Sequence, residues 1–145
     1  MTELGSRRWM VPFFLAPGLG LLSLILPVLA FSPPPVEAPL FPLLATGVKH
    51  MSFTTLGLLF LSGVLLSGAF SGKGSWVASF LVLAAMPVVI LAEGIADPSS
   101  HNLFPFELVM YGALSLITLL GAGIGIVARR RVMHVPRNSG ESVRR

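Results

Sequence analysis

Three side chains that can bind metals or carry protons are spaced four residues apart in this sequence. They are Glu93, Asp97 and His101. On a continuous helix, residues four apart share one face, so two carboxylates and an imidazole would point to one place. Such oxygen and nitrogen ligands suit Zn²⁺, Cu²⁺ or Mn²⁺. With His50 and Glu107 as further ligands, a divalent-metal site is one hypothesis for this chain.

A proline argues against one continuous helix over these residues. Pro98 removes a backbone donor directly after Asp97 and is expected to break the helix there. In the alternative interpretation, Asp97 and Asn102 cap two helices and Glu107 complements the dipole of the second. This interpretation requires no cofactor, and we predict none. The candidate site comprises His50, Glu93, Asp97, His101, Asn102 and Glu107.

The elements that must position these residues are membrane-spanning helices. Four stretches contain no Asp, Glu, Lys, Arg or His, and each has a length that can cross a membrane. About 20 apolar residues cross a hydrocarbon layer of about 30 Å, and backbone groups in lipid must be paired within a helix. The predicted spans are near Met10–Phe31, Phe53–Phe70, Trp76–Ile95 and Leu108–Ala128. The second span has an alternative start near Leu40.

Composition excludes most soluble classes of protein. The chain has 145 residues, of which 54% are hydrophobic and 11% charged, whereas soluble domains carry about 25% charged residues. A soluble enzyme, a nucleic-acid-binding domain, a coiled coil and a disordered tail are therefore poor interpretations. The chain contains no cysteine, which excludes disulfide exchange and cysteine nucleophiles.

The positions of the basic residues predict the orientation in the membrane. Two arginines precede the first span, Lys73 lies between the second and third, and six arginines follow the fourth. Only Lys49 falls on the other side. The positive-inside rule then places both termini in the cytoplasm of a plasma or bacterial inner membrane. This explains the net charge of +4 without nucleic-acid binding.

These observations predict an all-α integral membrane protein with four antiparallel transmembrane helices. Residues 1–131 form the four-helix domain, and residues 132–145 form a basic cytoplasmic tail. The uncharged stretch that contains the first span, 9–36, has 28 residues, which exceeds the apolar stretch of a cleaved signal peptide. We therefore interpret it as an uncleaved anchor.

One acid is expected at the edge of the hydrocarbon. A helix from Trp76 to Ala92 is about 25 Å long, so Glu93 lies at or slightly below the outer boundary. A carboxylate at this depth usually faces the bundle interior, a partner or an aqueous cavity. The predicted ion pair is Glu93–Lys49 or, as the alternative, Glu107–His50. Proton-coupled transport is an alternative, although no acid lies at the midplane of any span.

Small residues predict close helix packing. Several are spaced four apart, which allows helix backbones to approach. They pack either within this bundle or against another subunit. Three prolines that lie beyond the first turn of a predicted span predict kinks or breaks. The small residues are Gly63, Ser67, Gly68, Gly72, Gly121 and Gly125, and the prolines are Pro17, Pro27 and Pro87.

The motifs of several four-helix membrane families are absent. There are no cysteines for quinone-linked disulfide exchange, no acid in the first span as in small multidrug exporters, and no histidine inside a span for b-type haem. We predict first a non-enzymatic accessory or interaction subunit, with the lipid bilayer and other membrane subunits or a second copy as partners. The alternatives are a binding or catalytic site on the outer loops, and a transporter or channel component.

Overall fold

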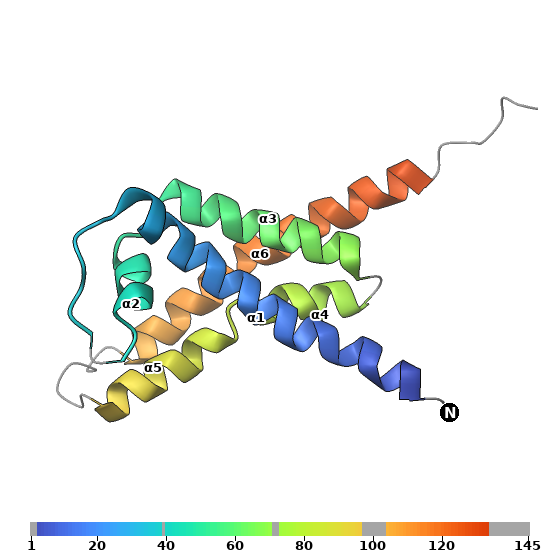
Figure 1. Cartoon of the computed structure of the whole chain (residues 1–145). Helices are drawn as coiled ribbons and strands as arrows, with labels where there is room; N and C mark the ends of the chain where they lie inside the picture. The colour runs from blue at the N-terminus through green and yellow to red at the C-terminus, as the bar shows by residue number, and fades with distance from the viewer. Residues whose placement is uncertain (1–2, 39, 71–72, 97–103, 134–145) are drawn as a thin grey trace, which may run out of the picture.

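The described part of the chain is entirely helical apart from its connections (Figure 1). The computed structural model describes residues 3–38, 40–70, 73–96 and 104–133. No strand occurs within these ranges, which confirms the predicted all-α class. The helices are α1 (Glu3–Phe31), α2 (Pro42–Lys49), α3 (Phe53–Ala69), α4 (Lys73–Leu81), α5 (Ala85–Ala96) and α6 (Phe104–Met133).

Three helical segments are long and apolar enough to cross a membrane. They are Phe14–Phe31, Lys73–Ala96 and Phe106–Val132. A fourth candidate is the pair α2 and α3, which is bent by 104°. The chain is therefore a membrane-type helical protein with three candidate spans, or four if the bent pair counts as one.

The boundary between α2 and α3 follows from local capping. Ser52 accepts a hydrogen bond from the Thr55 N–H at 3.3 Å, while the Thr55 hydroxyl accepts from the Ser52 N–H at 3.5 Å. This capping box satisfies backbone donors that a helix start leaves free. Residues 42–49 form a separate helix that begins with Pro42 at its first turn. The long helix thus starts at Phe53, and not near Leu40.

The predicted third span is interrupted near its middle. Between α4 and α5, the Ala84 N–H donates to the Leu81 carbonyl and the Met86 N–H to the Leu83 carbonyl, both at 3.0 Å. These bonds span three residues instead of four. Pro87 has no N–H to donate to Leu83, and its ring crowds that carbonyl. By contrast, α1 continues through Pro17 and Pro27.

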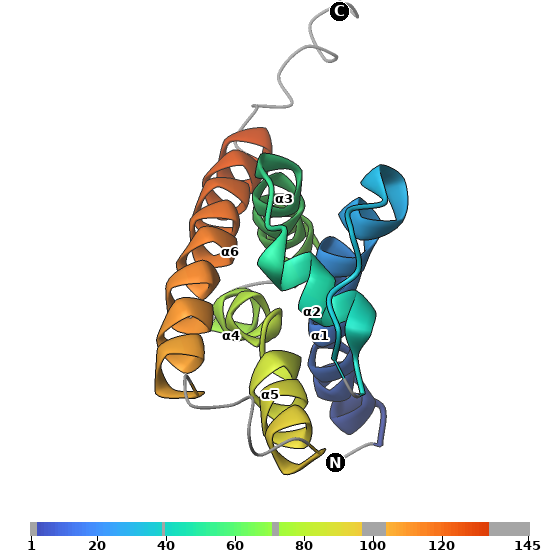
Figure 2. The same ribbon diagram turned by 90° about the vertical axis from the view of Figure 1, so that its left-hand side faces the viewer.

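Helices α3 and α6 form the most extensive contact among the described elements and lie side by side (Figure 2). A methyl group built on Gly63 would overlap the Thr118 carbonyl oxygen, and one on Gly121 would overlap the Phe60 carbonyl oxygen. The two backbones therefore touch. A methyl group on Gly125 would likewise overlap a neighbouring hydroxyl of α3.

Two hydrogen bonds join α4 and α1 to this pair. The Thr118 hydroxyl donates to the Ser79 carbonyl at 2.7 Å, which joins α6 to α4. The hydroxyls of Ser23 and Ser62 lie 3.2 Å apart and join α1 to α3. Interhelical hydrogen bonds of this kind suit a membrane interior, where water is not available as a partner.

Candidate functional site

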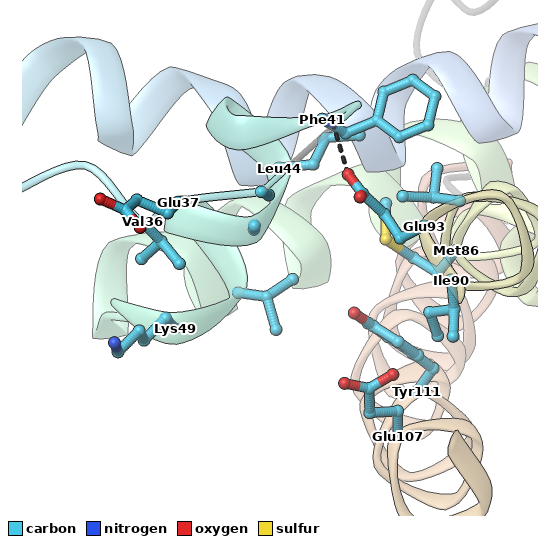
Figure 3. A pocket seen from close by; sticks show the side chains of 14 residues that line it. Val36, Glu37, Phe41, Leu44, Lys49, Met86, Ile90, Glu93, Glu107 and Tyr111 are labelled. Carbon is cyan, nitrogen blue, oxygen red and sulfur yellow. Dashed lines mark hydrogen bonds between the residues drawn. The ribbon is translucent and has the colours of Figure 1, made fainter. Parts of the chain in front are cut away.

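A cavity of about 310 Å³ lies between α2 with its preceding segment on one side and α5 and α6 on the other (Figure 3). We call residues 36–38 and 40–49 the cover, since they close one side of the cavity. The apolar lining residues are Val36, Ala38, Phe41, Leu44, Ala45, Val48, Met86, Val89 and Ile90. The polar ones are Glu37, Lys49, Glu93, Glu107 and Tyr111.

The Glu93 carboxylate connects α5 to the start of the cover helix. One of its oxygens accepts from the Phe41 N–H at 2.5 Å and from the Leu40 N–H at 3.1 Å, and the other lies 3.3 Å from the Leu40 nitrogen. The Glu93 side chain is buried, with 7% of its surface exposed. These hydrogen bonds explain how a carboxylate is tolerated there.

The position of these donors gives Glu93 the role of a helix cap supplied by another helix. Phe41 occupies the N-cap of α2 and provides no capping side chain, and Pro42 follows it. The N–H groups at the start of a helix need acceptors, and a negative charge there is stabilising. Glu93, on α5, supplies both the acceptor and the negative charge. It thereby anchors the cover to the opposite wall of the cavity.

The cover has two more fixed points. The Thr46 hydroxyl accepts from the Val36 N–H at 3.0 Å and donates to the Pro42 carbonyl at 2.7 Å. The bond from Val36 holds the extended segment before α2 against that helix. A Cβ built on Gly47 would lie 2.6 Å from the Leu24 carbonyl oxygen, so α2 packs directly on the backbone of α1.

The structure places several predicted site residues around this cavity. Figure 3 shows Glu107 and Tyr111 side by side on α6, below Glu93. Lys49 is exposed on the cover, on a different side of the cavity from Glu93 (Figure 3). The Glu93 carboxylate accepts hydrogen bonds from backbone N–H groups. Within the described residues it forms no ion pair with Lys49.

One predicted site residue, His50, is not brought to the cavity. His50 ends α2, where its N–H donates to the Thr46 carbonyl at 2.9 Å, and its side chain is exposed outside the cavity lining. Asp97, His101 and Asn102 lie outside the described residues. Within the described ranges, no three His, Asp or Glu residues are grouped so that they could hold a metal ion.

Of the residues predicted to pack helices closely, four lie at a helix contact in the described part of the chain. Gly63, Ser67, Gly121 and Gly125 lie at the α3–α6 contact. Gly68 is exposed, and a Cβ built there would meet no atom within 4 Å. Gly72 lies outside the described residues.

Sequence reasoning did not assign Tyr111 or Glu37 to a site. Tyr111 is the single tyrosine of the chain and follows Glu107 by four residues. This spacing places both side chains on one helix face, which was a usable signal. Glu37 is one of the acids on the predicted outer side, but nothing in its local sequence connects it with α5 or α6.

The lining combines an apolar wall with carboxylates, an ammonium and a phenol, groups that bind ligands through charge and hydrogen bonds. Such a mixture of apolar surface with a few polar groups is typical of small-molecule sites. Comparisons with protein-family models, curated proteins and solved structures found no match to this chain. The geometry of the cavity is therefore the guide to function.

Proposed function

We propose that this chain is a four-span membrane protein that binds a small ligand in the cavity beneath the cover. The observation that carries the proposal is the cavity itself, of about 310 Å³ and closed on one side by a segment that the buried Glu93 anchors. Ligand sites commonly measure about 300–1,000 Å³. A carboxylate that connects two walls keeps such a site preformed.

In the proposed topology, α3 crosses the membrane and α2 lies along the outer surface. Successive spans are antiparallel, both termini are cytoplasmic, and the cavity opens on the outer face. The bend of 104° between α2 and α3 supports this arrangement. The excess of Lys and Arg at the opposite end supports the orientation.

Cysteine labelling tests the topology cleanly because the chain contains no cysteine. Glu37→Cys and Lys73→Cys each introduce one thiol at an exposed position, on the cover and at the start of α4. A membrane-impermeant maleimide added to intact cells should label the first variant, and the second only after lysis. Labelling of both from outside, or the reverse order, would overturn the topology.

Two adjacent valines on α5 provide a matched test of ligand binding. Val89 lines the cavity, whereas Val88 is 67% exposed and does not line it. A Val89→Trp substitution fills the cavity, and Val88→Trp adds the same bulk outside it. Native mass spectrometry of gently extracted protein should show a bound small molecule in the wild type and in Val88→Trp, but not in Val89→Trp. A wild-type protein without bound mass would overturn the proposal.

A non-enzymatic interaction subunit is the second candidate, and the observation that favours it is Gly68. The open surface at this exposed glycine lets a helix of another subunit, or of a second copy, approach the backbone of α3. Gly68→Leu should then release a partner that co-purifies at a fixed ratio. An unchanged assembly mass would argue against this candidate.

A further inference from the structure

The charge and polarity of the cavity lining specify the kind of ligand that it fits. Resting on the proposed binding function, we infer that the cavity binds a cationic amphiphile, with an amine or quaternary ammonium head and an apolar chain. The inference comes from three properties of the lining: its apolar wall, the sign of its charge and its aromatic ring.

The apolar wall is formed by side chains that are themselves buried. Met86, Ile90 and Leu44 are among the core residues of the bundle and also line the cavity. Val89 and Val48 extend this surface between α5 and α2. An alkyl chain that enters the cavity leaves water for apolar surroundings, which is favourable.

The charged groups of the lining favour a positive head. Three carboxylates, Glu37, Glu93 and Glu107, face one ammonium, that of Lys49. With all four ionised, three negative charges against one positive charge give a formal charge of −2. Charges interact more strongly beside a low-dielectric interior than in water. An anionic head would therefore be repelled.

The ring of Tyr111 supplies a third interaction. It lines the cavity next to Glu107 (Figure 3). The face of an aromatic ring attracts ammonium groups. A head placed between Glu107 and Tyr111 lies near the apolar lining of α5, against which an attached chain would pack. The same arrangement would accept a free amphiphile or the ammonium head of a membrane lipid.

The test compares three probes that share a dodecyl chain. The full-length protein in neutral maltoside micelles is titrated with dodecyltrimethylammonium, with dodecyl phosphate and with an uncharged dodecyl ether. Native mass spectrometry and the unfolding temperature report binding. We expect the cationic probe to bind at least tenfold more tightly than the other two. Loss of its binding on addition of phosphatidylcholine, but not of phosphatidylglycerol, would identify a lipid head as the ligand source.

Charge variants identify the groups that select the head. Glu37→Gln combined with Glu107→Gln should weaken binding of the cationic probe about tenfold or more. Glu3→Gln removes one charge at the start of α1, the end opposite to the cover, and should leave binding unchanged. If the Glu37/Glu107 variant unfolds, Glu37→Gln alone provides the comparison.

The outcomes separate this inference from the proposed function. Equal binding of all three probes, abolished by Val89→Trp, would refute the cationic preference and leave the binding cavity in place. Tighter binding of dodecyl phosphate would do the same. Failure of every probe to bind the wild type would overturn both.

Discussion

Removal of the Glu93 carboxylate should release the cover while leaving the helical bundle folded. Glu93 accepts hydrogen bonds from the N–H groups of Leu40 and Phe41 and thereby anchors the start of α2. Among the described residues, the other side-chain hydrogen bonds of the cover lie within the cover itself, and Gly47 packs on α1. Loss of the carboxylate therefore frees the side of the cover that closes the cavity.

The free energy lost on removing the carboxylate follows from two hydrogen bonds to a charged acceptor. Such bonds contribute about 1.5–3 kcal/mol each. The exposed fractions of Leu40 and Phe41 are 49% and 38%, so water can reach the freed N–H groups and the loss is smaller than the sum. We expect Glu93→Ala to cost about 2–3 kcal/mol for closure of the cover. Glu93→Gln retains a neutral acceptor, which is about half as strong, and should cost about 1 kcal/mol.

Hydrogen exchange of the backbone amides of α2 measures this closure directly. A loss of about 2–3 kcal/mol raises the exchange rate roughly 30- to 160-fold for Glu93→Ala, and about 1 kcal/mol raises it roughly fivefold for Glu93→Gln. Glu37→Gln neutralises an exposed carboxylate on the same cover and should change little. Unchanged exchange in Glu93→Ala, or an equal rise in Glu37→Gln, would refute the anchoring role.

Three further predictions concern the bundle. Gly63→Ala should lower the free energy of unfolding in detergent by about 1–3 kcal/mol, because its methyl group would overlap the Thr118 carbonyl. Gly68→Ala, at an open position, should change stability little. Equal effects of the two substitutions would contradict the close contact at Gly63. Thr118→Val removes the 2.7 Å hydrogen bond to the Ser79 carbonyl. It should lower the free energy of unfolding by about 0.6 kcal/mol, and by at most about 1.7 kcal/mol. A larger loss would mean that the substitution also disturbs packing. Pro87→Ala restores a backbone donor after the break in the third span and should increase the helical circular dichroism at 222 nm; an unchanged signal would assign the break to packing against α1.

The sequence was most informative where hydrophobicity alone decides the structure. Runs without ionisable residues marked the long helices, since lipid-facing segments exclude charge. The structure extends the last of them from the predicted Leu108–Ala128 to Phe104–Met133. The added turns include polar and charged residues, because a helix continues past the hydrocarbon once it has formed. A criterion based on charge therefore finds the apolar part of a helix and misses its ends.

The candidate site was less accessible to sequence reasoning because its partners are backbone groups. The depth of Glu93 along its span indicated that the carboxylate needed a partner, and Lys49 was the nearest opposite charge in the outer loops. The structure instead gives it the N–H groups of Leu40 and Phe41. Because almost every residue has a backbone N–H, the sequence does not indicate which of these groups will pair with a buried carboxylate. Only Pro42, a typical first-turn residue of a helix, indicated that free N–H groups precede it.

The unequal lengths of the two most tightly packed helices have a consequence for the surrounding lipid. In the proposed topology, α3 with its 17 residues is about 25 Å long, whereas the uncharged stretch of α6, residues 108–128, is about 32 Å long. A bilayer that contains both helices must thin beside α3 or tilt α6, and each response costs free energy for every ångström of mismatch. Because the touching backbones at Gly63 and Gly121 prevent the two helices from adjusting independently, the protein should favour thin membrane regions over thick, sterol-rich ones.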